Sequence, residues 1–381
     1  MTNSPPFGLL LFGGQLTHQE NYARAFAADP RCRLIGTAET PGANALRQKR
    51  DRQLADELGI PYFTDLSAAL ARDDVDFVCI CADDENRADL TAACAAAGKH
   101  IYADKEPAIT VEGLDRVEAA VRESGVFTQT FSLVRTPWAQ SARETLRSGK
   151  VGDLLGLHCE LFFAKGESGT ADLSWPRREI SSPTRFTFFD VKRELLCVGY
   201  YPLVFFEWLT GARVIDVYAV TANYFFREHQ QNDIEDFSAL VVTLSNGLQA
   251  TITCGRSGWH SHPQSGIQQI HLVGDKGSAT VDAFSSRLEV YSDAEPWRAP
   301  RPDPDDPMGF WSSTQERMGV QPKQDWQIVA PGVPDDFRYF LDCLEQRRPS
   351  DMPIEIGTRA IRVILAAYES AERGERVEIK G

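Results

Sequence analysis

The feature that most constrains this chain is a regular alternation of short apolar segments and helical segments over its first third. The segment Val75–Ala82 (VDFVCICA) is almost entirely apolar. A strand that is apolar on both faces is typical of a parallel sheet covered by helices on both sides. The repeated strand–helix succession therefore predicts an α/β fold with a doubly wound parallel sheet.

The pattern changes after about Ser132, where longer strands follow one another through turns such as Asn246-Gly247. Such turns favour antiparallel hairpins. Because 381 residues exceed one ordinary core, two domains are expected. We predict an α/β domain over residues 1–132 and an α+β domain with a large, mostly antiparallel sheet over residues 133–381. Residues 294–332, rich in proline and tryptophan, are expected to form a surface excursion, either a lid or a partner-binding loop.

Composition excludes some classes of partner. The net charge of −14 argues against nucleic acid and anionic membranes. The eight cysteines lack ligand-like spacing, which indicates reduced thiols and no metal centre. The apolar run Phe7–Phe12 has no basic flank and is too short to span a bilayer, so we expect a first strand and a cytoplasmic protein.

One apolar strand runs directly into charged residues. Ile101–Ala103 is followed by Asp104, Lys105 and Glu106, and then by Pro107. Open α/β folds keep their ligands at the carboxyl ends of parallel strands. We therefore predict a functional role for Lys105, the alternative being a solvated lysine at a strand end.

A glycine pair between the first strand and the first helix indicates a nucleotide site. Gly13 and Gly14, followed by Gln15 and Leu16, stand where a Rossmann turn lets the backbone approach a pyrophosphate. The full G-x-G-x-x-G pattern is not met, and a plain tight turn explains the pair about as well.

An acidic residue at the end of the second strand strengthens this interpretation. Glu39 would accept hydrogen bonds from the adenosine ribose hydroxyls and repel a 2′-phosphate, which favours NAD over NADP. The alternative is an exposed acid in a turn. Arg47, Lys49 and Arg50 lie nearby and keep NADP possible.

With these motifs, the chain resembles the glucose–fructose oxidoreductase / inositol dehydrogenase / rhizopine catabolism (Gfo/Idh/MocA) family of NAD(P)-dependent oxidoreductases. Four segments carry the resemblance over nearly the full length: VDFVCICADDENRADLTAACAAAGKHIYADKEPAIT, LRSGKVGDLLGLHCELF, GYYPLVFFEWLTG and DDFRYFLDCLEQRRPSDMPIEIGTRAIRVILAAYESAERGERVEI. It implies a Rossmann domain followed by a substrate domain with a large sheet. It further implies hydride transfer between nicotinamide and a secondary alcohol or ketone of a sugar, polyol or related cyclic substrate.

The expected cofactor site combines the glycine turn and Glu39 with residues at two strand ends, namely Ala82, Asp83, Asp104 and Lys105. The resemblance also suggests a homodimer or homotetramer packed through the strands between about Asp236 and Tyr291.

The chain departs from the family at two places. Glu106 intervenes where the family usually has proline directly after lysine. The second-domain helix, which often carries a histidine and an aspartate, here holds Cys197, Tyr201 and Val204. A tyrosine at the histidine position, such as Tyr201, resembles the glucose–fructose oxidoreductase and dihydrodiol dehydrogenase branches of the family.

Alcohol oxidation moves a hydride to nicotinamide and a proton to a base. We expect desolvation to lower the pKa of Lys105 toward neutrality, and the ammonium to make the Tyr201 phenol more acidic, so that the two form an acid–base couple. The alternative for Tyr201 is a packed aromatic. Arg135 is expected to meet substrate at the domain junction, or to form an interdomain salt bridge.

Two other functions stay open at this point. The first is a non-redox enzyme that uses bound NAD transiently, in glycoside cleavage or elimination. The second is a non-catalytic NAD(P)-binding sensor.

Overall fold

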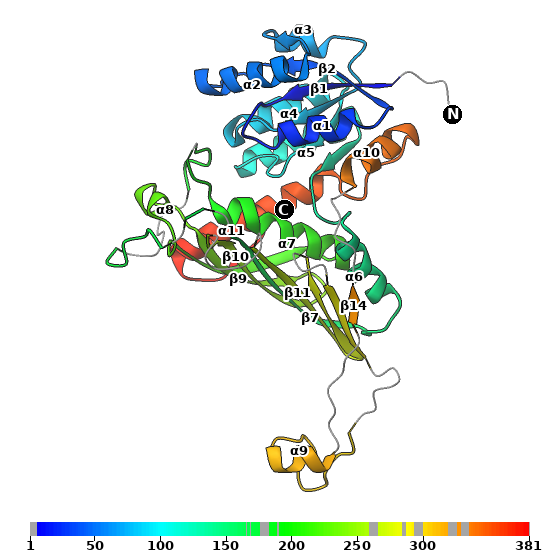
Figure 1. The fold of residues 1–381 in the computed structure, drawn as a ribbon, viewed down its shortest axis with the longest axis vertical. Helices are drawn as coiled ribbons and strands as arrows, with labels where there is room; N and C mark the ends of the chain where they lie inside the picture. Colours follow the sequence, from blue (N-terminus) through cyan, green and yellow to red (C-terminus); the bar gives the residue numbers. More distant parts are fainter. Residues whose placement is uncertain are drawn as a thin grey trace.

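The computed structural model of the chain describes residues 6–164, 166–167, 169–175, 183–188, 190–258, 266–283, 287–292, 300–318, 326–328 and 335–380. Two sheets dominate it (Figure 1).

The N-terminal sheet has six parallel strands in the order β3-β2-β1-β4-β5-β6, with helices on both faces. The chain moves outward from β1 to β3 and then returns to β4 on the other side of β1. Such a reversal opens a ligand-binding crevice at the carboxyl ends of the strands. The predicted doubly wound parallel sheet is thus confirmed. Its strands are β1 (Phe7–Phe12), β2 (Cys32–Ala38), β3 (Tyr62–Phe63), β4 (Phe77–Ile80), β5 (His100–Ala103) and β6 (Thr128–Thr130).

The helices of this part follow local sequence signals. The helix α2 begins where the Asn44 side chain accepts a hydrogen bond from the backbone N–H of Arg47 at 3.0 Å. It ends at Gly59, which adopts the left-handed conformation that glycine favours. The helical elements are α1 (Gln19–Ala27), α2 (Ala45–Leu58), α3 (Leu66–Leu70), η1 (Asp84–Asn86), α4 (Arg87–Ala96) and α5 (Val111–Ser124).

The strand β1 divides the core into two layers, because successive side chains of a strand point to opposite faces. Leu10 and Phe12 pack in the core that includes residues of α4 and α5. Leu9 and Leu11 pack in the core on the other face, with residues of α1 and with Phe340 of α10 (Asp336–Glu345). A helix near the end of the chain therefore completes the core of the N-terminal sheet.

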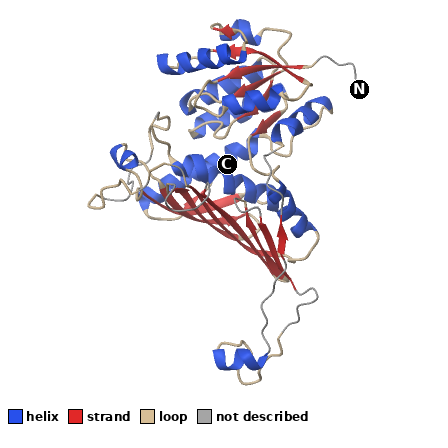
Figure 2. Cartoon of the chain, viewed as in Figure 1, coloured by secondary structure: helices blue, strands red, loops and turns tan. Residues whose placement is uncertain are grey.

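The C-terminal sheet has nine strands in the order β14-β13-β12-β11-β7-β10-β9-β8-β15. Of its described pairings, only β7 with β10 is parallel, so the predicted mostly antiparallel sheet is confirmed. Figure 2 shows helices covering one of its faces. The strands are β7 (Leu154–Phe163), β8 (Val214–Ala222), β9 (Phe237–Leu244), β10 (Gln249–Arg256), β11 (Gly266–Gly274), β12 (Gly277–Asp282), β13 (Arg287–Ser292), β14 (Trp326–Ile328) and β15 (Val377–Glu378).

The helix α7 (Glu194–Thr210) links the two sheets. Nearly all its side chains are apolar and buried, as is typical of a helix enclosed in a core. The Tyr200 hydroxyl lies 2.5 Å from the Thr130 hydroxyl at the end of β6. The remaining helices are α6 (Pro137–Arg147), α8 (Arg227–Gln231), α9 (Ser312–Met318) and α11 (Ile354–Arg373). None of the helices within the described residues combines the length and the apolar character that a membrane crossing requires. The domain boundary at residues 132 and 133 stays a prediction.

Local details differ from the sequence-based expectations. The first helix does not follow the glycine pair directly but begins at Gln19, because Leu16 adopts a positive φ of 58° that a helix does not allow. The short elements β3, β15 and α8 were not expected, since two to five residues carry too little periodicity.

Part of the predicted excursion 294–332 lies outside the described residues, including Trp297. Within it, α9 lies beyond the C-terminal sheet, at the opposite end of the molecule from the N-terminal sheet (Figure 1). Phe310 and Trp311 beside α9 are 73% and 64% exposed. Its role as a lid or partner-binding loop stays a prediction.

The packing of α10 leads to a stability prediction. Phe340 is fully buried, so Phe340→Ala should lower the free energy of unfolding by about 3–5 kcal/mol through lost burial and a residual cavity. Denaturant unfolding measures this change. The matched control, Phe310→Ala on the exposed excursion, should stay within about 0.5 kcal/mol of wild type. Equal effects of the two substitutions would contradict the assigned packing of α10.

Candidate active site

A cavity of about 600 Å³ lies between the carboxyl edge of the N-terminal sheet and elements of the C-terminal half. One wall comes from the residues after β1, β4 and β5, as the crevice of a doubly wound sheet requires. The facing wall comes from the described part of the segment before α7, from α7 itself, from α8 and from the end of β10. Predicted site residues in its lining are Leu16, Ala82, Asp83, Asp104 and Lys105.

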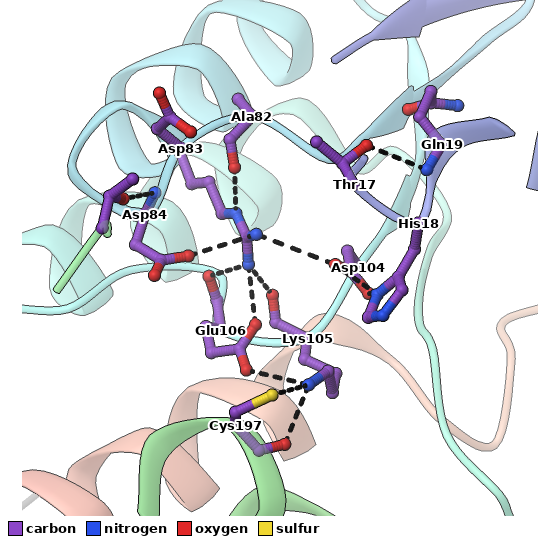
Figure 3. A network of polar contacts seen from close by, with 12 residues as sticks. Thr17, His18, Gln19, Ala82, Asp83, Asp84, Asp104, Lys105, Glu106 and Cys197 are labelled. Carbon is purple, nitrogen blue, oxygen red and sulfur yellow. Dashed lines mark hydrogen bonds and ion pairs between the residues drawn. The ribbon is translucent and has the colours of Figure 1, made fainter. Parts of the chain in front are cut away.

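Arg87 lines this cavity and is the centre of a polar network. Its partners Ala82, Asp84, Lys105 and Glu106 are labelled in Figure 3. Its Nε donates to the carbonyl of Ala82 at 2.7 Å, and its Nη1 donates to the Glu106 carboxylate at 2.8 Å and to the carbonyl of Lys105. Its Nη2 lies 3.1 Å from Asp84. One buried guanidinium thus connects the end of β4 to the segment after β5.

Asp104 occupies the first position after β5 and is buried. Its carboxylate lies 3.1 Å from Nδ1 of His18 and accepts a hydrogen bond from the Tyr22 hydroxyl at 2.8 Å. Burial acts to raise the pKa of Asp104, but the contacts with His18, Arg87 and Lys105 outweigh burial and lower it well below its usual range. The side chain is therefore a buried anion that fixes His18 at the rim of the cavity.

Lys105 places its amine against α7. Its Nζ donates to the carbonyl of Cys197 at 2.8 Å, and lies 3.1 Å from the Cys197 sulfur and 3.3 Å from Glu106. Burial acts to lower the Lys105 pKa, but the electrostatic interactions of the ammonium with Cys197, Glu106, Tyr201 and Asp104 outweigh burial and raise it well above its usual value. The expected drop toward neutrality is therefore wrong, because the sequence did not reveal how many acidic groups surround the amine.

Glu106, which departs from the family pattern, joins the two cations of the site. Its carboxylate contacts Arg87 with one oxygen and Lys105 with the other. Its backbone adopts a φ of 53°, a conformation that non-glycine residues rarely hold without support from their surroundings. Here the support comes from the hydrogen bonds that Arg87 donates to its carbonyl and carboxylate oxygens.

Tyr201 lies beside Lys105, as predicted, but presents its ring. The Lys105 Nζ is 5.0 Å from the ring centroid, which is a cation–π distance. Burial raises the pKa of Tyr201, and the neighbouring ammonium only partly offsets this. The expected acidic phenol is therefore wrong. Tyr201 does not belong to the described residues that line the cavity.

Arg135 is also outside the set of described residues that line the cavity. Its guanidinium pairs with Asp351 and lies 3.5 Å from the centroid of the Tyr339 ring. The geometry matches the salt bridge that was the alternative interpretation of this residue.

The glycine turn packs against its neighbours. A Cβ on Gly13 would lie 2.7 Å from the carbonyl of Cys81, and one on Gly14 would lie 2.4 Å from the backbone of Arg50. The two glycines therefore allow close approach of β4 and α2, and the described cavity lining begins only at Leu16. Gln15 donates its amide to Glu57 at 2.7 Å.

Glu39 stands directly after β2, as expected. It accepts hydrogen bonds from the Tyr62 hydroxyl at 2.9 Å and from the Gln48 amide at 3.1 Å. It does not belong to the described cavity lining, which on this side contains Arg47 and Arg50. Arg47 is held 2.5 Å from Asp83.

Sequence reasoning missed several residues of the cavity wall. Arg87 was overlooked, and Cys197 was noted only as a departure from the family, because the roles of both depend on contacts across the fold. A signal existed for Arg87: an arginine at the start of a helix, where the helix dipole disfavours a cation, suggests compensating carboxylates. No group of three or more metal-ligating side chains with suitable geometry occurs within the described residues.

Comparison with known proteins identifies the class to which this fold and cavity belong. Residues 11–131 match the family described as "Oxidoreductase family, NAD-binding Rossmann fold", and residues 139–280 match "GFO/IDH/MocA C-terminal domain". The chain therefore belongs to the Gfo/Idh/MocA oxidoreductase family. The predicted family is confirmed, and its description names the predicted oxidoreductase class and an NAD-binding Rossmann fold.

Individual relatives are distant. The chain is 23% identical to "Uncharacterized oxidoreductase YrbE" of Bacillus subtilis over 62% of its own length and 64% of that protein. It is 31% identical to "Inositol 2-dehydrogenase" of Pseudomonas syringae pv. syringae over 27% of its own length and 31% of that enzyme. The alignments thus span less than two thirds of these curated relatives.

Solved structures show the same fold over nearly the whole chain. GenD2 from gentamicin A biosynthesis, solved in complex with NAD, has a TM-score of 0.71 and 19% identity, and the match covers 100% of this chain and 98% of GenD2. The WlbA dehydrogenase from Bordetella pertussis, in complex with NADH and UDP-GlcNAcA, has a TM-score of 0.70 and 19% identity, with 98% and 99% covered.

The network around Arg87 leads to a second prediction. Arg87→Met should lower the free energy of unfolding by about 3–5 kcal/mol, because it leaves buried carboxylates without their cation. Thermal or denaturant unfolding measures this. Arg116→Met, which removes an exposed ion pair with Asp89, should cost less than about 1 kcal/mol. If the Arg87 variant were as stable as the control, Arg87 would not hold the site together.

Proposed function

We propose that this protein transfers a hydride between NAD(H) and a secondary alcohol or ketone of a sugar, polyol or related cyclic substrate, with Lys105 as the catalytic residue. The observation that carries the proposal is the position of Lys105. Its side chain lines the cavity at the carboxyl edge of an NAD-binding Rossmann sheet, where the reactive end of a bound dinucleotide is expected.

Bound NAD(H) supplies the chemistry that accepts or gives the hydride. The chain's own contribution is a cation at the reacting oxygen. The raised pKa keeps Lys105 as an ammonium at neutral pH, so in ketone reduction it would stabilise the alkoxide that forms and donate a proton to it. In alcohol oxidation the deprotonated amine of the same residue would take up the hydroxyl proton. Cys197 and Glu106 orient the amine from two sides.

Tyr201 has a supporting part in this proposal. Its ring face stabilises the ammonium, and its phenol holds its proton because burial raises the pKa. We therefore assign proton transfer to Lys105 alone and treat Tyr201 as a positioning residue. Arg135 has no part in substrate binding in this proposal, because its guanidinium pairs with Asp351.

The residues assigned to the cofactor are those at the strand ends. Leu16, Ala82 and Asp83 line one continuous cavity with Lys105 and fit a dinucleotide extended along the sheet edge. Asp104 acts behind them by fixing His18. Gly13 and Gly14 contribute to this sheet edge by allowing the close approach of β4 and α2.

We also propose that the protein forms a homodimer or homotetramer through the open face of the C-terminal sheet. Apolar side chains project from this face, including Tyr218, Val220 and Val241, which are 40%, 45% and 38% exposed. Adjacent apolar residues on a sheet face favour burial against a partner. Light scattering at micromolar concentration should therefore give at least twice the mass of 42.4 kDa, and a monomer would contradict the proposal.

The catalytic assignment predicts unequal effects of two substitutions. Lys105→Met should reduce turnover by roughly 10²–10⁴-fold while NADH affinity stays within a few-fold, because the proton donor and the charge are both lost. Tyr201→Phe keeps the aromatic face and should cost less than about 10-fold. The change in NADH absorbance at 340 nm measures both.

Lys99→Met serves as the matched control. Its amine binds the carbonyls of Arg72 and Val75, and the residue does not belong to the described cavity lining, so turnover should not change. Full activity of Lys105→Met would contradict the catalytic assignment and favour the alternative of a non-catalytic NAD(P)-binding sensor. Product formation without net absorbance change would favour the non-redox enzyme.

Cofactor preference gives a further prediction. Titration of protein fluorescence should show tighter binding of NADH than of NADPH, because the Glu39 carboxylate repels a 2′-phosphate. Glu39→Gln should reduce the ratio of the NADPH Kd to the NADH Kd by about 10-fold. Glu112→Gln on the exposed surface of α5 should leave this ratio unchanged. A clear preference for NADPH would remove Glu39 from this role and favour Arg47 and Arg50.

A further inference from the structure

We propose that Glu194, His229 and Arg256 form a second polar subsite of the cavity, which binds adjacent hydroxyls of a neutral polyhydroxylated ring, with His229 as a specificity-determining contact. The inference rests on the proposed function, since this ring would be the substrate whose alcohol or ketone reacts near Lys105.

The three residues come together from separate elements. Glu194 opens α7, His229 lies on α8, and Arg256 ends β10, and all three line the cavity. Glu194 precedes Cys197 by three residues on the same helix, so their side chains lie on one face. Because Cys197 contacts the Lys105 amine, the subsite adjoins the reacting end of the cavity.

The acidic member of the subsite is a fixed anion. Glu194 is fully buried, and one of its oxygens accepts a hydrogen bond from Nε of Arg256 at 2.6 Å. Burial acts to raise the Glu194 pKa, but the contacts with His229 and Arg256 prevail and lower it. The carboxylate therefore stays an acceptor at neutral pH.

Among the three residues, His229 provides the evidence for a ligand. Its side chain is 4% exposed, and its Nε2 lies 3.6 Å from Glu194, which is an ion-pair distance when the imidazole is protonated but is beyond hydrogen-bond distance. Neither ring nitrogen has a hydrogen-bond partner among the described residues. An unsatisfied buried polar group costs about 1–3 kcal/mol, so a hydroxyl that meets the ring would recover a substantial free energy.

The other histidines of the described residues behave differently. His18 contacts Asp104, His100 accepts a hydrogen bond from the Phe127 amide, and His158 and His271 pair with threonine hydroxyls. His229 is thus set apart from the other imidazoles in this part of the chain, and it is in the cavity wall.

Hydrogen bonds hold the turn that precedes His229. The Asp236 carboxylate accepts hydrogen bonds from the backbone amides of Tyr224, Phe225 and Phe226, at 2.7, 2.7 and 3.0 Å, and so fixes the turn that leads into α8. The Phe226 ring lies 5.3 Å from the imidazole, centroid to centroid. A fixed imidazole can select a substrate by geometry.

Charge distribution favours a neutral ligand. On the wall from the C-terminal half, Arg193 and Arg256 are already paired with Glu235 and Glu194. A substrate carboxylate there would meet the Glu194 anion, whereas a hydroxyl can donate to Glu194 and accept from His229 or Arg256. The acidic residues in the lining of this wall are Glu167, Asp190, Glu194 and Glu228, and the basic ones are Lys192, Arg193 and Arg256.

Calorimetric titration of the NADH-saturated protein tests the subsite without turnover. The neutral probes are myo-inositol, D-glucose and D-xylose, and the acidic probe is D-glucuronate. We expect at least one neutral ring to bind tighter than D-glucuronate. His229→Phe should raise the Kd of that ring about 10-fold or more, and NADH binding should stay within twofold.

Two comparisons separate a direct contact from a structural effect. Arg227→Gln, on the exposed side of the same helix, should leave the Kd unchanged. Monodeoxy analogues of the best ring should bind wild type unequally, and the weakest of them should bind His229→Phe as well as the parent ring does. His229→Gln, which keeps polar atoms near the subsite, should fall between wild type and His229→Phe.

Several results would overturn the subsite. These are an unchanged Kd in His229→Phe, an equal loss for every deoxy analogue, tighter binding of D-glucuronate, or no binding of any neutral ring. Failure of the proposed function is separate, because it shows as a missing absorbance change at 340 nm while these binding differences persist.

Discussion

The interaction on which the site depends is the buried ion cluster around Arg87. A cation at the first turn of α4 faces an unfavourable helix dipole. Burial alone would add several kcal/mol to that cost. Three carboxylates, from Asp84, Asp104 and Glu106, surround the guanidinium and offset both effects. The cluster in turn fixes the backbone after β5, and so it decides where Lys105 points.

The same cluster explains the electrostatics of the cavity. The carboxylates of Asp104 and Glu106 in the N-terminal wall balance the charge of Arg87. The same two carboxylates also act on the Lys105 ammonium. An isolated buried lysine would lose its proton more easily, but this one keeps it because Glu106 lies 3.3 Å away. The result is an ammonium in the cavity wall, which the proposed function uses to stabilise negative charge on a substrate oxygen.

The cavity wall from the C-terminal half is organised in a similar way. There the buried Glu194 is balanced by Arg256, and His229 stands beside it. Each wall thus pairs a buried charge with a partner of opposite sign and places a further nitrogen-bearing side chain, Lys105 or His229, in the cavity lining. Because the α7 backbone carries both Glu194 and the Lys105 contact at Cys197, the two walls are held in one geometry.

The sequence alone determined the architecture and the position of Lys105. Apolar strands such as Val75–Ala82 require a buried parallel sheet, and topology then brings the residues after β5 to its ligand-binding edge. Only the tertiary structure decided the environment of those residues. The partners of Lys105 and Tyr201, and the joining of Glu194, His229 and Arg256, come from segments far apart in the chain. Local periodicity does not record such contacts, and the direction of a pKa shift depends on them.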